Sequence, residues 1–162
     1  MNSISPLDEQ HLRRCVELAE QALDAGDDPF GSLLVDADGA VLAEALNRES
    51  TDQDPTAHPE LELVHWAIAH LTPEQRAAST VYTSGEHCPM CAAAHGWAGL
   101  GRIVAAVSST QLAEWRESWG LRPGPVSVLP VAVVAPGVNV IAGVPPFDSE
   151  MRELHLRARN RA

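Results

Sequence analysis

The chain has 162 residues, 45% of them hydrophobic, and this length predicts one domain, residues 1–162, with a substantial core. Its 11 Lys and Arg against 22 Asp and Glu give a formal charge of -11, which disfavours a nucleic-acid partner because phosphate backbones are also negative. No stretch reaches the roughly 20 apolar residues of a membrane span and Met1 to Leu7 contains no basic and apolar leader, so we expect a cytoplasmic protein without a membrane partner.

Hydrophobic periodicity and turn residues predict helices that alternate with strands. In chain order the expected elements are a helix from Ser5 to Gly26, strands at 30–35 and 41–46 joined by Asp36-Ala37-Asp38-Gly39 as a hairpin, a helix at 58–71 capped near Thr56, a strand at 80–83, a helix at 88–98, a strand at 103–107, a helix at 110–119, a strand at 126–134 split by Pro130, and a helix at 149–159 capped by Asp148. Residues 135–162 would form a Pro/Gly-rich linker and this last helix. The alternation predicts an α/β fold of three layers, with a mixed five-stranded sheet covered by helices on both faces.

Two short segments carry the residue types of a hydrolytic zinc site. His58-Pro59-Glu60 is followed, 28 residues after the Glu, by Cys88-Pro89-Met90-Cys91. A catalytic zinc keeps three protein ligands and leaves one position to water, so we expect Zn²⁺ on His58, Cys88 and Cys91. Glu60 is then free to take a proton from the water, and the pattern resembles the H-x-E and P-C-x-x-C signature of zinc deaminases that act on nucleobases.

The cysteine spacing also allows other interpretations. Three cysteines cannot form a complete disulfide set, and a C-x-x-C pair in a reducing compartment is typical of a metal or redox site. A structural zinc site would need a fourth protein ligand, for which His65, His70, His87 and His95 are the candidates. Cys15 lies on the apolar stripe of the first helix, where core packing is expected. Glu60 taken alone would be a favourable charge in a helix first turn.

Between residue 29 and about residue 104 the chain resembles the zinc-dependent cytidine deaminase superfamily, in particular its guanine deaminase-like branch. The segments that carry the resemblance are Pro29-Phe30-Gly31, Asn47, Asp54-Pro55-Thr56-Ala57-His58-Pro59-Glu60, Thr83-Ser84-Gly85-Glu86, Cys88-Pro89-Met90-Cys91 and Trp97-Ala98. The resemblance implies the cytidine deaminase-like fold and the hydrolytic deamination of a free nucleobase or a related aminated heterocycle of guanine, cytosine or aminotriazine type. It also implies that Asn47 hydrogen-bonds the base edge, that Phe30 packs on the ring and that Trp97 lines the pocket. Phe30 and Trp97 as core residues, and Asn47 as a turn residue, are the structural alternatives.

The chain departs from the family pattern at two positions, because Pro59 replaces the usual Ala and His87 the usual Pro. His87 could contact the substrate, contact a zinc ligand or face solvent, and we expect one of the first two. The tail after Leu154 has no aromatic residue, and no clear acid replaces the one expected near Trp119, although Glu117 and Asp148 are nearby, so the sequence does not settle which base is preferred.

Three other functions compete with nucleobase deamination: a tRNA adenosine deaminase, disfavoured by the charge; a cytidine or dCMP deaminase, for which no cationic phosphate clamp is evident; and a non-enzymatic zinc protein. The resemblance also implies a homodimer, with Trp115 and Trp119 on one helix as candidate interface or core residues.

Overall fold

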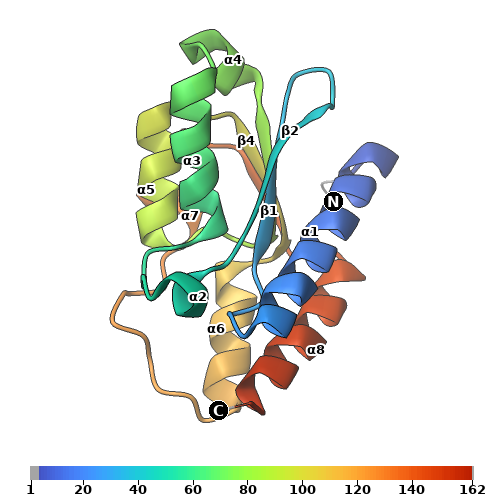
Figure 1. The fold of residues 1–162 in the computed structure, drawn as a ribbon, viewed down its shortest axis with the longest axis vertical. Coiled ribbons are helices and arrows are strands. Elements are labelled where there is room, and N and C mark those ends of the chain that lie inside the picture. Colours follow the sequence, from blue (N-terminus) through green and yellow to red (C-terminus); the bar gives the residue numbers. More distant parts are fainter. Residues whose placement is uncertain (1–3, 162) are drawn as a thin grey trace.

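A mixed sheet of five strands lies between two layers of helices in the computed structural model, which describes residues 4–161 (Figure 1). Residues 1–3 and 162, the ends of the predicted domain, lie outside the described residues. The elements in chain order are α1 Pro6–Ala25, β1 Gly31–Val35, β2 Val41–Leu46, α2 Glu49–Asp52, α3 Pro59–His70, α4 Pro73–Ala78, β3 Thr80–Gly85, α5 Pro89–Ala98, β4 Arg102–Val107, α6 Ser109–Ser118, α7 Val131–Val134, β5 Val140–Ala142 and α8 Phe147–Arg159.

The strand order is β2-β1-β3-β4-β5. β1 is antiparallel to both β2 and β3, whereas β3, β4 and β5 run parallel to one another. The hairpin of β1 and β2 turns as predicted, because the Asp36 side chain accepts backbone hydrogen bonds from Asp38 and Ala40, and Gly39 adopts a φ of 89°. The predicted mixed five-stranded sheet is therefore confirmed.

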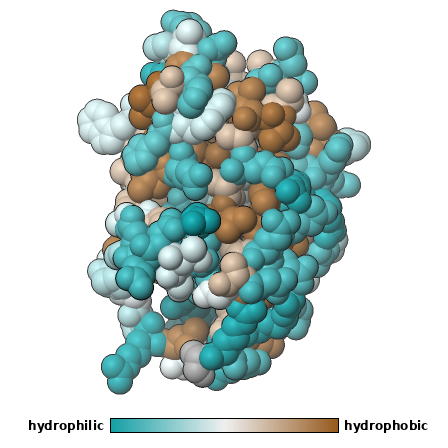
Figure 2. All heavy atoms as spheres, in the orientation of Figure 1, coloured by the Kyte–Doolittle hydropathy of each residue, from teal (hydrophilic) through white to brown (hydrophobic). Residues whose placement is uncertain are grey.

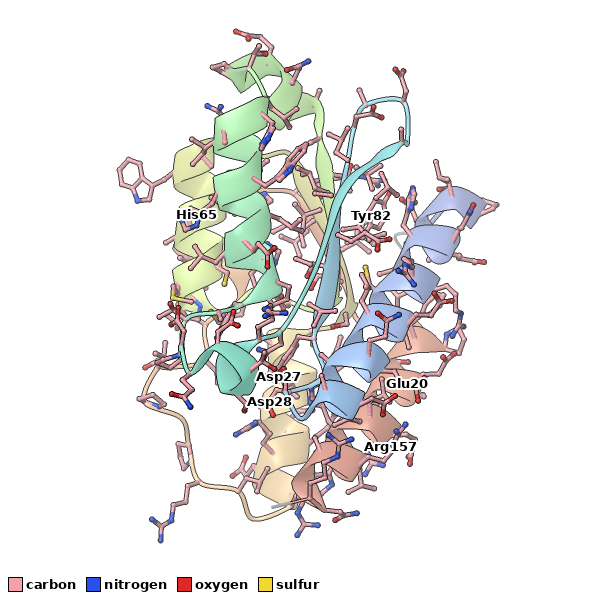
Figure 3. The ribbon with its side chains drawn as sticks, in the orientation of Figure 1. Glu20, Asp27, Asp28, His65, Tyr82 and Arg157 are labelled. Carbon is pink, nitrogen blue, oxygen red and sulfur yellow. The ribbon has the colours of Figure 1, made fainter. Side chains whose placement is uncertain are left out.

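Two hydrophobic cores, one on each face of the sheet, define the three layers. α1 and α8 cover one face, where Leu12, Leu33 and Met151 are fully buried. An ion pair of 2.8 Å between Glu20 and Arg157 joins these two helices at the surface (Figure 3). α3, α5 and α7 cover the other face. Cys15 is fully buried in the first core, as predicted.

The surface in the orientation of Figure 2 is mostly hydrophilic, and its hydrophobic residues form small separate groups. No helix in residues 4–161 is long and apolar enough to cross a membrane.

The fifth strand is not where the sequence analysis placed it. The predicted strand at 126–134 is wrong: its first half has no regular structure, and Val131–Val134 forms the short helix α7. Val126 and Val128 are 56% and 57% exposed, so they have no sheet face to bury. The backbone N–H of Val131 donates to a side chain, Glu86, at 2.8 Å. The strand that pairs with β4 is instead Val140–Ala142, inside the segment predicted to be a linker.

Two predicted caps are also wrong. The Thr56 hydroxyl donates to Asp54 at 2.7 Å, and the capping residue of α3 is His58, which makes no side-chain capping hydrogen bond. α8 begins one residue before Asp148, with Pro146 at the capping position. Trp115 and Trp119 are half-buried, and Trp115 packs against the core formed with α1 and α8, which favours the core alternative for Trp115.

Candidate active site

The predicted zinc ligands meet where the first turns of α3 and α5 lie side by side. His58 is the N-terminal capping residue of α3, Cys88 has the same position on α5, and Cys91 lies one turn later. Pro59 and Pro89 each occupy the first helical position, where the missing N–H costs no hydrogen bond. The Nδ1 atom of His58 is 3.5 Å from the Cys88 sulfur and 3.6 Å from the Cys91 sulfur.

This donor set fits zinc with one open coordination position. One nitrogen and two sulfur atoms lie within 4.8 Å of one another, and no fourth His, Cys, Asp or Glu of residues 4–161 joins the group. His65 is exposed on α3 (Figure 3), and the Nε2 atom of His95 lies 2.8 Å from the carbonyl oxygen of Gly101. A structural zinc site with four protein ligands therefore lacks its fourth ligand, whereas three ligands match a catalytic site.

The electrostatics of the cluster favour a thiolate. Hydrogen bonds from Cys91 and from His58 outweigh partial burial and lower the pKa of Cys88 to about 4. The same hydrogen bond to Cys88 raises the pKa of His58 to about 9, since the imidazolium faces the thiolate. The N-terminus of α5 adds the positive end of its helix dipole. The Cys88 sulfur is thus an anionic donor beside His58.

Glu60 lies in the first turn of α3, outside the ligand group, and is 5% exposed. Burial raises the pKa of its carboxyl group because the charged form loses hydration. The hydroxyl of Thr83, on β3, lies 3.1 Å from Glu60 Oε1 and holds the carboxylate in place. A carboxyl group with a raised pKa beside a metal site is suited to both accept and donate a proton.

A cleft of about 90 Å³ opens onto these residues. Its walls are Phe30, Asn47, His58, Pro59, Glu60, Glu86, Cys88 and Leu112. Asn47 is 1% exposed, and its side chain is held at both ends by Glu49: Nδ2 donates to Oε1 at 2.9 Å, and Oδ1 accepts from the backbone N–H at 3.1 Å. The Phe30 ring packs edge-on against His155 of α8, with ring centres 5.0 Å apart. The structure therefore brings Asn47 and Phe30 to the cleft that holds Glu60.

Comparison with known proteins places the chain in a family. Residues 5–107 match the model of the cytidine and deoxycytidylate deaminase zinc-binding region. The chain belongs to this family. It is 40% identical to the guanine deaminase of Bacillus subtilis over 65% of this chain and 68% of that protein. It is 33% identical to a probable cytosine deaminase of Schizosaccharomyces pombe over 74% of this chain and 72% of that protein. tRNA-specific adenosine deaminases are also among its relatives.

The fold agrees with this assignment. The structure of the guanine deaminase from Nitrosomonas europaea superposes with a TM-score of 0.73, at 20% identity, over 98% of this chain and 86% of that one. The chain is therefore a zinc-dependent deaminase with the cytidine deaminase-like fold, and its relatives support the guanine deaminase-like branch. Zinc is its cofactor, in agreement with the chemistry of the His and Cys cluster.

The structure does not bring Trp97 to the deaminase cleft, which corrects its assignment as a substrate contact. Its side chain is 92% exposed and lines a separate hollow of about 470 Å³ together with residues 134–138, at the end of α7 and directly after it. Trp97 lies six residues after Cys91, which puts it on another side of α5 and almost two turns away.

His87 lies beside the site but outside the cleft with Glu60. The imidazole is 1% exposed, packs edge-on against His95 with ring centres 5.2 Å apart, and lines an adjoining cavity of about 150 Å³ together with Cys88. Burial keeps it neutral by lowering its pKa well below the usual value. Of the roles considered for His87, exposure to solvent is excluded. A position next to the zinc ligand Cys88 agrees with the structure.

Sequence reasoning missed three residues of the deaminase site. The Oε1 atom of Glu49 lies 2.9 Å from His58 Nε2, within ion-pair distance. Glu86 accepts backbone hydrogen bonds from Ser109 and Val131, each at 2.8 Å, and so ties the ends of α6 and α7 to the cleft. Leu112 supplies an apolar wall from α6. Glu86 follows a predicted strand and precedes a zinc ligand, which was a usable signal, whereas Glu49 and Leu112 carry no local pattern.

Proposed function

We propose that this protein hydrolytically deaminates a free nucleobase, with His58, Cys88 and Cys91 holding zinc and Glu60 moving the protons. The observation that carries the proposal is the buried Glu60 carboxyl group, with its raised pKa, in the same cleft as a zinc cluster that has only three protein ligands among the described residues. When bound, zinc supplies a Lewis acid that brings the pKa of a coordinated water to about 7.

Glu60 performs two proton transfers in the proposed reaction. It accepts a proton from the water that attacks the ring carbon bearing the exocyclic amine, and it returns that proton to the ring nitrogen. Glu60 then moves the proton of the newly added hydroxyl group to the departing amine. Ammonia leaves, and the ring keeps a carbonyl group. One water is consumed for each ammonia released. Thr83 keeps the carboxylate oriented during both transfers through its contact of 3.1 Å.

Asn47 and Phe30 are positioned to recognise the base. With both ends of its amide held by Glu49, Asn47 keeps one N–H and one oxygen lone pair for the base edge. Phe30 offers an apolar ring surface in the wall of the same cleft. Leaving either polar group of a buried Asn47 unpaired costs about 1–3 kcal/mol, so the base edge that pairs with it is selected.

Guanine is the first substrate to test, because the Bacillus subtilis relative is a guanine deaminase. Cytosine follows from the Schizosaccharomyces pombe relative. Aminotriazines present the same amino-substituted carbon between ring nitrogens and complete the proposed class.

The test is ammonia release from the zinc-loaded protein with guanine, cytosine, isocytosine, adenine, aminotriazines, the matching nucleosides and tRNA. We expect turnover of at least one free base and none of its nucleoside. Turnover of nucleosides alone would replace the proposal with a cytidine-type deaminase. Activity on tRNA alone would replace it with a tRNA adenosine deaminase, which the charge of -11 disfavours. No ammonia from any substrate, with zinc bound, would leave a non-catalytic zinc protein.

We further propose that the protein is a cytoplasmic homodimer. Cys15, Cys88 and Cys91 are all free, as expected in a reducing compartment. The outer side of the α3, α5 and α7 layer exposes large apolar side chains, with Trp97 92%, Val133 63% and Ile68 54% exposed. A second copy of the chain that packs on this layer would remove them from water. Light scattering of the purified protein tests this state.

A further inference from the structure

We propose that Glu49 is a positioning residue that orients both the zinc ligand His58 and the base-facing amide of Asn47. Its Oε1 atom lies 2.9 Å from the Nε2 atom of His58, as an ion-pair contact, and accepts a hydrogen bond of 2.9 Å from the Nδ2 atom of Asn47. One carboxylate of the short helix α2 thereby connects the metal-binding part of the site to the substrate-binding part. This inference rests on the proposed function for the role of His58 as a zinc ligand and for the role of Asn47 in base binding.

Glu49 selects the ring nitrogen that His58 presents to the metal. A carboxylate only accepts hydrogen bonds, so the Nε2 atom of His58 that faces it must carry a proton. Nδ1, which faces both cysteine sulfur atoms, is then the nitrogen with a lone pair available to a metal. A carboxylate behind a ligating imidazole also makes the ligand more basic, and removal of such a partner typically costs 10- to 100-fold in metal affinity.

The same carboxylate decides which way the Asn47 amide points. The group of Asn47 that faces Glu49 Oε1 must be the NH₂, because Oε1 cannot donate. The group that faces the backbone N–H of Glu49 must be the oxygen, because that N–H cannot accept. The pattern that Asn47 shows to the cleft is therefore fixed by its neighbour two residues along the chain. In the absence of the Glu49 carboxylate, the NH₂ group loses its partner.

α2 itself is held in place from a distant part of the chain. The carboxylate of Asp27, which follows α1, accepts hydrogen bonds from the backbone N–H groups of Ser50 and Thr51 at 2.7 and 2.9 Å (Figure 3). Its other oxygen accepts from the Thr51 hydroxyl at 2.5 Å. Asp27 is 4% exposed, so these hydrogen bonds are shielded from water. They keep Glu49 within reach of both His58 and Asn47.

The first experiment measures zinc affinity, by competition with a chromophoric chelator, and therefore needs no substrate. We compare the wild type with Glu49→Ala, Glu49→Gln and the control Glu62→Gln. Glu62 is exposed, lies in the first turn of α3, and its substitution removes the same charge. We expect Glu49→Ala to weaken zinc binding about 10- to 100-fold. Glu49→Gln should recover part of this loss, because its amide oxygen still accepts a hydrogen bond, and Glu62→Gln should bind zinc as the wild type does.

A spectroscopic signature separates this role from a general structural one. In the zinc-loaded wild type we expect the Nε2 proton of His58 to exchange slowly enough to be seen by ¹H–¹⁵N NMR. The signal should disappear in Glu49→Ala and return in Glu49→Gln. Wild-type zinc affinity in Glu49→Ala, or a His58 signal unaffected by either substitution, overturns the inference for the metal site.

A double-mutant cycle tests the link to Asn47 by the binding of 8-azaguanine, a base analogue present in related structures, to the zinc-saturated proteins. Glu49→Ala should weaken binding about 10-fold when Asn47 is present, and should have no further effect in the Asn47→Ala background. Additive effects of the two substitutions refute the link. If the wild type does not bind the analogue, recognition of a guanine-type base is wrong, and the zinc and NMR measurements decide the role of Glu49.

Discussion

Replacement of Glu60 by Gln removes the proton carrier and leaves the shape of the cleft unchanged. The amide oxygen of Gln can still accept the hydrogen bond from Thr83, which is 3.1 Å away in the wild type. It cannot take a proton from water. Since general acid–base catalysis contributes about 10²- to 10⁴-fold, we expect kcat to fall by this factor, or about 3–5 kcal/mol in activation free energy.

The stability of the same variant should change in the opposite direction. Burial raises the pKa of Glu60, which means that the folded protein disfavours its charged form. Glu60→Gln removes the charge, so Tm at neutral pH should rise. Function at this position is thus expected to be maintained at the expense of stability.

The assay combines ammonia release with zinc analysis of the same preparation, and the control is again Glu62→Gln. Activity within tenfold of the wild type at full zinc occupancy would refute the assignment of Glu60 as the proton carrier. Loss of zinc from Glu60→Gln would mean that Glu60 is a ligand, contrary to its place outside the His and Cys group.

Three further predictions concern the fold and its surfaces. Hydrogen bonds from Tyr82 and Ser5 and the charge of Arg102 outweigh burial and lower the pKa of Asp8 from 3.8 to about 2. This ionised group stabilises the fold by about 2 kcal/mol above pH 4, and the contribution is lost as pH falls towards 2. The difference in unfolding free energy between the wild type and Asp8→Asn should therefore shrink over that range. A difference that is independent of pH contradicts this account. Gly31→Ala would place a Cβ 2.7 Å from the Cys15 carbonyl oxygen and 2.8 Å from the Ala19 nitrogen, so urea denaturation should show a loss of about 1–3 kcal/mol, and a wild-type midpoint would show that α1 can shift. Trp97→Ser should retain full ammonia release and weaken the dimer in light scattering, whereas inactivity of a folded variant would return Trp97 to the catalytic site.

Local sequence determined the parts of the structure that depend on short spacings. The α1 pattern predicted a helix because its apolar residues recur at helical spacing, and Gly26, with a φ of 96°, ends it. The hairpin followed from the Asp36 turn. The zinc cluster was also predictable, because the C-x-x-C spacing puts Cys88 and Cys91 within one turn of the same helix end.

The fifth strand could not be predicted, because its identity depends on a partner. Residues 126–134 have the more strand-like composition, but β4 pairs with the three-residue segment Val140–Ala142. Val131 instead satisfies its backbone N–H with the side chain of Glu86, 45 residues earlier in the chain. Local propensity is weak compared with the burial and hydrogen bonds that a neighbouring strand offers.

The chemistry of the site was therefore determined by the sequence alone, since His58, Glu60 and the two cysteines are recognisable by residue type and spacing. Only the tertiary structure decided their environment. It buried Glu60 against Thr83, placed Glu49 behind His58, and turned Trp97 away from the cleft. These relations join residues of different helices and strands, and they exist only after packing of the sheet has brought the starts of α3 and α5 together.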